Sequence, residues 1–212
     1  MAEIARRITG RVRSFVYLDE QHIWYTLNLD GVEELPLAEG YELRLGTDAD
    51  MERITGLGGT SLENADENRA RGAEAWLVEQ GEEPAFVCWI FPESTPVRAA
   101  TDRWLALPPG VACLEDSFTD ASHRGRGIAG AAWTKIAQGL KKRDFGVLIT
   151  KVDVDNAPSR KAVQKAGFRE ACLMRLRRRG PRETVTVETL PTELTPAEQA
   201  AAGEIKQRLE RH

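Results

Sequence analysis

The sequence predicts an α/β fold of the α+β kind, and the segment from 111 to 152 carries most of this prediction. An apolar, strand-like run at 111–119 leads into a basic, glycine-rich loop. An amphipathic helix follows, with apolar residues recurring every four positions at Ile128, Ala132, Ile136 and Leu140. A buried strand at 146–152 comes next, and the helix that crosses between the two strands should make them parallel. Hairpins elsewhere add antiparallel strands, so we expect a mixed sheet.

Composition places these elements in one globular domain with an extension at each end. The chain has 212 residues, of which 42% are hydrophobic and 29% are charged, and it can bury a sizeable core. We divide it into an N-terminal arm and β-hairpin at 1–40, a core domain at 41–180, and a C-terminal strand and helix at 181–212.

Charge and hydropathy argue against several function classes. The net charge of −4 disfavours a general nucleic-acid binder, and we interpret the arginines between 175 and 182 as a solvated face. No apolar run approaches the ~20 residues of a membrane span, and no signal sequence opens the chain. We therefore expect a cytoplasmic protein that binds neither nucleic acid nor membrane.

The cysteines and histidines do not suggest a metal site. Cys88, Cys113 and Cys172 each lie in apolar, strand-like sequence, so we interpret them as reduced core residues; a nucleophilic cysteine is the alternative. The three histidines do not combine with them at metal-ligand spacing, and we predict no metal.

Before the glycine-rich loop, the pattern predicts an N-terminal hairpin and then the core. Residues 2–13 resemble a short helix or an arm. The β-rich runs 15–18 and 23–27 flank the turn-like Asp19-Glu20-Gln21, so we expect a hairpin that acts as a covering flap or a dimer edge. The alternative is that Trp24 and Tyr25 wall an acceptor pocket. The core should then continue with a strand at 41–45, a helix capped by Thr47 or Asp48 and broken at 56–59, a polar helix at 61–71, and strands at 75–78 and 85–91.

The remaining segments complete the core and its C-terminal extension. An irregular insertion at 92–109, strand-like at 104–107, is expected to help shape an acceptor site. After the buried strand, a helix at 157–165 and a strand at 168–177 should close the core. A short strand at 185–187 and a charged helix with a capping box at Thr195 follow, and this helix is either frayed or a partner contact.

The loop at 123–130 predicts a phosphate-binding site. A loop at a helix N-terminus gathers unpaired backbone N–H groups and the positive end of the helix dipole, and here Arg124 and Arg126 add two guanidinium groups. Gly125, Gly127 and Gly130 also match the dinucleotide fingerprint.

The dinucleotide alternative fits the surrounding residues poorly. Asp153 and Asp155 lie at about the right distance for a ribose-binding acid, but that fold turns directly from its strand into the first glycine. In this chain residues 120–124 intervene. A structural loop without a ligand is a further alternative.

The same residues carry a resemblance to a known family. Arg124 to Ala129 have the pattern Arg/Gln-x-x-Gly-x-Gly/Ala, which resembles the pyrophosphate loop of the GNAT superfamily of N-acetyltransferases. The superfamily's second motif is matched, in the correct order, by Asn156, Ser159, Ala162 and Gly167-Phe168. This resemblance covers roughly 41–177. It implies a GNAT fold, with a mostly antiparallel sheet, a central splayed pair of parallel strands, and helices on both faces.

The resemblance also implies acetyl-CoA as co-substrate and assigns residues to it. Backbone N–H groups of the loop should cradle the pyrophosphate, and the Thr119 N–H should polarise the thioester carbonyl. Asn156 and Ser159 should contact the pantetheine arm, although helix capping explains them equally well. The expected acetyl-CoA-binding residues are Phe118, Thr119, Arg124, Gly125, Arg126, Gly127, Ile128, Ala129, Asn156 and Ser159.

Glu115 and Asp116 are the candidate catalytic bases. Strand alternation places Glu115 on one face with Cys113, Ser117 and Thr119, and Asp116 on the other with Leu114 and Phe118. Only one carboxylate should then face the cleft. We favour Glu115 as the base, with Asp116 and a reaction without a base as alternatives.

One position departs from the family pattern. Val163 stands where many members have a tyrosine as general acid. In this respect the chain resembles the Ser-containing branch, similar to ribosomal-protein-alanine acetyltransferases, that acts on protein N-termini and related amines. We predict acetyl transfer to a primary amine of a small molecule or peptide; a non-catalytic acyl-CoA-binding or sensing module is the alternative.

Overall fold

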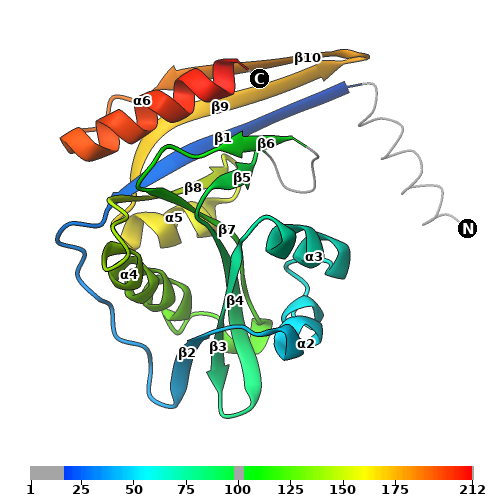
Figure 1. Cartoon of the computed structure of the whole chain (residues 1–212), viewed down its shortest axis with the longest axis vertical. Helices are drawn as coiled ribbons and strands as arrows, with labels where there is room; N and C mark the ends of the chain where they lie inside the picture. The colour runs from blue at the N-terminus through cyan, green and yellow to red at the C-terminus, as the bar shows by residue number, and fades with distance from the viewer. Residues whose placement is uncertain (1–16, 98–102, 212) are drawn as a thin grey trace, which may run out of the picture.

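The computed structural model describes residues 17–97 and 103–211, and its centre is one eight-stranded sheet (Figure 1). The strands follow the order β10-β9-β1-β8-β7-β4-β3-β2 across the sheet. Their bounds are β1 (Tyr17–Asn28), β2 (Tyr41–Leu45), β3 (Glu74–Gln80), β4 (Glu83–Phe91), β7 (Val111–Thr119), β8 (Val147–Asp153), β9 (Arg169–Arg179) and β10 (Arg182–Thr189). A separate two-stranded sheet is formed by β5 (Ser94–Pro96) and β6 (Trp104–Ala106).

The predicted mixed sheet is confirmed. In the described part of the sheet, β7 and β8 pair in parallel, from Val111–Leu114 against Val147–Thr150, whereas the other paired strands run antiparallel. The helix that makes this parallel connection is α4 (Ile128–Lys141). The other helices are α2 (Met51–Gly56), α3 (Leu62–Ala70), α5 (Ala157–Lys165) and α6 (Pro196–Glu210).

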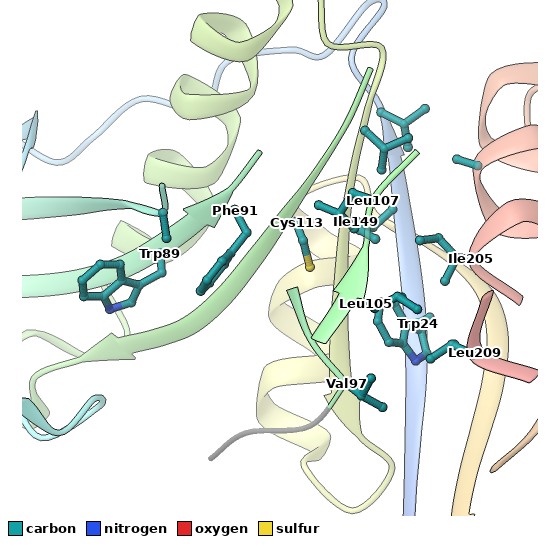
Figure 2. Close-up of a cluster of buried hydrophobic side chains, with 14 of the residues drawn as sticks. Trp24, Trp89, Phe91, Val97, Leu105, Leu107, Cys113, Ile149, Ile205 and Leu209 are labelled. Atoms are coloured by element: carbon teal, nitrogen blue, oxygen red, sulfur yellow. The ribbon is translucent and has the colours of Figure 1, made fainter. Parts of the chain in front are cut away.

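Helices cover both faces of the sheet and bury a separate core on each. On one face, α4 and α5 pack over side chains that include Phe86, Leu114 and Leu148. The opposite face carries α2, α3, the β5–β6 hairpin and α6, packed over Trp89, Cys113 and other buried residues. Figure 2 shows Trp24 of β1 beside Leu105 of β6 and Leu209 of α6 in this second core.

Helix ends in the core follow their local sequence. Thr47 and Asp50 form a capping box ahead of α2, and the Ser61 hydroxyl accepts the N–H of Asn64 at the start of α3. The predictions of the strand at 41–45, the helices at 47–56 and 61–71, and the hairpin at 75–91 are therefore confirmed, with shifts of one or two residues at the ends.

The predicted N-terminal hairpin is wrong. Residues 17–28 form the single strand β1, which lies inside the sheet between β8 and β9. The turn-like residues Asp19 to Gln21 lie where β1 runs beyond the end of β8, and there the Asp19 carboxylate pairs with the guanidinium groups of Arg175 and Arg177 on β9. These arginines explain why polar residues continue the strand. The runs at 2–13 and 15–16 lie outside the described residues.

The C-terminal helix is also more firmly placed than expected. α6 buries Ala201, Ile205 and Leu209 against the sheet, so the alternative that it is frayed is wrong. Its Glu198 is almost fully buried, caps the helix together with Thr195, and accepts a hydrogen bond from the Thr26 hydroxyl of β1 at 3.3 Å. The strands β1 and β10 thus belong to the sheet that carries the core strands, and α6 packs against it.

Candidate functional site

A cleft opens where the parallel ladder of β7 and β8 ends. The last paired residues are Leu114 and Thr150, and the Thr150 hydroxyl donates a hydrogen bond to the Leu114 carbonyl at 2.8 Å. Beyond them a cavity of about 690 Å³ is lined by both strands, the glycine-rich loop, α4 and α5. Its size is typical of sites that bind small molecules and cofactors.

The β7 strand contains a β-bulge at Asp116, and this bulge changes the predicted faces. Between Val87 and Trp89 of β4 there is one residue, whereas two lie between their partners Phe118 and Glu115. Asp116 has a φ of 47°, in the left-handed region. An extra residue of this kind interrupts the alternation of side chains along a strand. The face assignment made by simple alternation is therefore wrong beyond Glu115.

Contacts show how the side chains are distributed around the bulge. Glu115 contacts Cys113 on the face that carries α2 and α3, and Asp116 reaches the same side, where the Thr60 hydroxyl lies 3.4 Å from its carboxylate. Ser117 instead accepts a hydrogen bond from the indole of Trp133 on α4, at 3.1 Å. Both carboxylates thus lie on one face and both line the cleft.

Glu115 is held in a buried ion pair. Its side chain is 8% exposed and contacts the ammonium group of Lys151, which is 4% exposed. The same carboxylate oxygen accepts a hydrogen bond from the Thr95 hydroxyl at 3.0 Å and lies 3.1 Å from the Cys113 thiol. Because this carboxylate already contacts Lys151, Thr95 and Cys113, the geometry does not favour Glu115 as the base.

Asp116 has the electrostatic character of a base that works near neutral pH. Burial raises the pKa of its carboxyl to about 6, the charge of Glu115 acts in the same direction, and Lys151 and the Thr60 hydroxyl oppose them. In the described part of the chain no cation forms a salt bridge with Asp116. A carboxylate with a pKa close to the working pH combines availability with useful basicity.

The glycine-rich loop has the backbone needed to approach a phosphate. Gly125 and Gly127 have φ values of 78° and 76°, and Gly127 is the N-cap of α4. A Cβ atom at either position would meet no atom within 4 Å, so the space in front of the loop is open. These glycines are required for their left-handed φ, and a side chain there would extend into the open space.

The two arginines of the loop point to different places. Arg124 lines the cleft and donates to the Thr119 carbonyl at 3.1 Å. Arg126 turns back to the hydroxyl of Tyr41 at 2.8 Å, and that hydroxyl also lies 2.8 Å from Nδ1 of His123. Arg124 alone thus lines the cleft, while Arg126 anchors the loop to β2.

The backbone of Thr119 is available to the cleft. The Asp120 N–H donates to the Ala85 carbonyl, so this pair is hydrogen-bonded toward β4. Because hydrogen-bonding direction alternates along an antiparallel strand, the N–H of Thr119 points to the other edge, toward the opening between β7 and β8. A donor there could polarise a carbonyl group held in the cleft.

The predicted cofactor residues divide into two groups. Asn156 caps α5 by accepting the N–H of Ser159 at 3.2 Å, which agrees with the capping interpretation, and both residues also line the cleft. The other predicted residues that line it are Phe118, Thr119, Arg124, Gly125 and Ala129. Arg126, Gly127 and Ile128 do not line the cavity itself.

Sequence reasoning missed three residues of the cleft region. Lys151 lies in a mostly apolar strand, and a lysine there is a signal that a buried acid faces it. Thr60 follows the glycines at 58–59 without a distinguishing pattern. His22 could not be placed before β1 was located; burial, followed by the charge of Lys151, lowers its pKa, and its buried Nδ1 has no hydrogen-bond partner among the described residues.

The comparison with protein families decides the identity of this arrangement. The model of the acetyltransferase (GNAT) family matches residues 47–168, more than half of the chain. The chain belongs to the GNAT acetyltransferase family. The match includes the bulged strand, the glycine-rich loop, α4, β8 and α5.

Individual relatives agree with this family but are distant. An uncharacterized N-acetyltransferase of Methanocaldococcus jannaschii is 29% identical over 103 residues, which are 48% of this chain and 46% of that protein. The chain thus aligns with about half the length of this curated relative. A GCN5-related N-acetyltransferase from Sphaerobacter thermophilus has a TM-score of 0.55 at 14% identity, covering 90% of this chain and 58% of that one. The ribosomal-protein-S18-alanine N-acetyltransferase from Escherichia coli has a TM-score of 0.50 at 15% identity, covering 62% and 79%. These structures are similar to this chain in fold.

Two features are absent from the described residues. Between residues 17 and 97 and between 103 and 211, no helix is long and apolar enough to cross a membrane. In the same two ranges, no three His, Cys, Asp or Glu side chains gather as metal ligands would.

The loop geometry predicts that Gly127→Glu abolishes acetyl-CoA binding. The new side chain would bring bulk and negative charge into the open space in front of the loop. Calorimetry on the folded variant should show at least a roughly 100-fold weaker Kd, since both effects oppose a phosphate. Gly180→Glu is a matched control, because Gly180 also has a left-handed φ (56°) but lies in the β9–β10 turn. Unchanged affinity in Gly127→Glu would contradict the site.

The raised pKa of Asp116 predicts a pH-dependent effect on stability. The fold favours the protonated carboxyl, so ionisation costs stability as pH rises from the ordinary value of 3.8 through about 6, and the cost is complete above that. Asp116→Asn should therefore be more stable than the parent at pH 8, by about 1 to 3 kcal/mol, and should lose this advantage near pH 3.5. Urea denaturation at both pH values measures the difference. Asp144→Asn is the control, because Asp144 is exposed and also has a left-handed φ (63°). A stability difference between Asp116→Asn and the parent that does not change with pH would refute the explanation.

Proposed function

We propose that this protein transfers an acetyl group from acetyl-CoA to a primary amine, with Asp116 as the general base. The observation that carries this proposal is the position of a carboxylate with a near-neutral pKa in the cleft that begins where β7 and β8 separate. Membership of the GNAT family supports acetyl-CoA as the donor.

The residues present fit the donor. The left-handed glycines and the N-terminus of α4 offer backbone N–H groups to the pyrophosphate, and Arg124 adds a positive charge beside them. The cleft between the strands then receives the pantetheine arm. At its end, the inward-facing N–H of Thr119 would polarise the thioester carbonyl.

The chemistry requires that the attacking nitrogen lose a proton. The nitrogen forms a bond to the acetyl carbon, the carbon–sulfur bond breaks, and the departing sulfur takes up one proton. Asp116 accepts the proton released by the amine, because its carboxylate lines the cleft and is not consumed by an ion pair. This reverses the preference for Glu115 that strand alternation suggested.

The position that holds a general acid in many family members holds Val163 in this chain. Val163, which lines the cleft and is 3% exposed, has no proton to give to the leaving sulfur. In the proposed reaction the sulfur is therefore protonated from water. Because a valine at this position resembles the branch that acts on protein N-termini, a peptide amine belongs in any panel of acceptors together with small amines.

Kinetics should identify Asp116 as the base. With an accepted amine, Asp116→Asn should lower kcat by roughly 10²- to 10⁴-fold with little change in acetyl-CoA affinity. The parent's rate should rise with pH through about 6 and level off above it, because the base must be deprotonated, and the variant should lack this rise. Thiol release from acetyl-CoA measures both.

The controls separate three outcomes. Asp144→Asn should keep the parental profile. An active Asp116→Asn variant with an unchanged pH profile would exclude Asp116 as the base. A protein that binds acetyl-CoA but releases no thiol with any amine of the panel would instead support the non-catalytic acyl-CoA-binding alternative.

A further inference from the structure

The floor of the cleft contains a buried pair of opposite charges at a defined position. The parallel ladder ends at Leu114 and Thr150, and the next residues on the two strands are Glu115 and Lys151. Their side chains meet in the ion pair described above, with 8% and 4% of each side chain exposed. This contact spans the gap at the point where the strands begin to separate.

Lys151 contacts two other groups besides Glu115. Its ammonium donates to the carbonyl of Pro96 at 2.8 Å and lies 5.3 Å from the ring centre of Trp24 on β1. Glu115 accepts from Thr95, the neighbour of Pro96. The pair therefore connects four segments, namely β7, β8, β1 and the β5 part of the 92–109 insertion.

The bulge brings this pair next to the proposed base. Asp116 follows Glu115 directly and its side chain lies on the same face, where Thr60 donates to it and Trp89 in turn donates to Thr60 at 3.2 Å. His22 of β1 also lines the cleft, and the charges of Lys151 and Glu115 act on its pKa in opposite directions. Because Glu115 and Lys151 are buried and Asp116 and His22 are partly buried, water and salt screen these charges less than they screen charges on an exposed surface.

We propose that Lys151 is a positioning residue for acetyl transfer, which with Glu115 sets the electrostatic environment of Asp116 and fixes the floor of the cleft. Glu115 places a negative charge beside Asp116, and Lys151 compensates that charge across the gap. The two residues thus act on the base in opposite directions. The proposal rests on the proposed function only for the role of Asp116.

Removing the negative or the positive charge of the pair should shift the pKa of Asp116 in opposite directions. Glu115→Gln keeps the shape of the side chain but leaves Lys151 uncompensated, so the carboxylate of Asp116 is favoured and its pKa should fall. Lys151→Met leaves Glu115 uncompensated, so the pKa of Asp116 should rise. The double variant removes both charges and should return the pKa close to the parental value.

Carbon-13 NMR of the aspartate carboxyl groups tests this directly and needs neither acetyl-CoA nor an acceptor. Asp116 is assigned by the signal that Asp116→Asn lacks. We expect the midpoint to move down by about one pH unit in Glu115→Gln and up by about one in Lys151→Met. Lys151→Arg keeps the charge and should titrate like the parent. Repeating the series with His22→Gln removes the other titrating group near the pair.

The outcomes are separable from a general loss of structure. Disruption of the cleft would expose Asp116 to water and lower its pKa in every variant, so two shifts in the same direction, or no shift, would overturn the proposal. If Lys151→Met does not fold, the parent, Glu115→Gln and the charge-free double variant still test it, since a neutral replacement of both partners is better tolerated than one unpaired charge.

A kinetic measurement distinguishes this inference from the proposed function. The rise of kcat with pH should move in the same direction as the NMR midpoint of each variant. Shifted NMR midpoints with an unmoved kinetic rise would establish the electrostatic action of the pair but overturn Asp116 as the base. The same result would show that Lys151 is not a positioning residue for acetyl transfer.

Discussion

The site depends on the early end of one parallel strand pairing. β7 and β8 are paired only as far as Leu114 and Thr150. There the Thr150 hydroxyl donates a hydrogen bond to the Leu114 carbonyl, in place of a backbone N–H of a longer ladder. Backbone groups beyond this point must find other partners. The opening that results exposes the Thr119 N–H, receives the loop residue Arg124, and leaves the carboxylate of Asp116 in a cleft of about 690 Å³. A continuous parallel sheet would have no room for a ligand here.

The second constraint is the extra residue in β7. A left-handed φ at Asp116 is uncommon for a residue with a side chain and costs folding energy, as does a partly buried carboxylate that forms no salt bridge among the described residues. The surrounding structure compensates with two continuous cores, one on each face of the sheet. Strain and desolvation are thus concentrated where the proposed chemistry needs a reactive carboxylate, which is a frequent arrangement at active sites.

Sequence reasoning predicted the central elements because their signals are local. The four-residue period of α4, the caps at Thr47, Ser61 and Thr195, and the glycines of the loop depend on neighbours along the chain. The same reasoning failed for β1, because its polar residues are compensated by arginines of β9 that lie more than 150 positions away in sequence. It failed at Asp116 because alternation assumes a regular strand, and nothing in the local sequence marks a bulge there. Lys151 was overlooked for the related reason that its partner Glu115 is a long-range contact.

The central claim is that the donor and the amine meet in the β7–β8 cleft beside Asp116. A crystal structure with a bisubstrate analogue, in which coenzyme A is joined through an acetyl group to a primary amine, tests it most directly. We expect the pyrophosphate at the Gly125–Gly127 loop, the acetyl oxygen at the Thr119 N–H, and the amide nitrogen that derives from the amine within hydrogen-bond distance of Asp116. The account would be contradicted if the analogue bound in the separate cavity beside Asn28 and Lys165, or if it entered the cleft with its nitrogen away from Asp116.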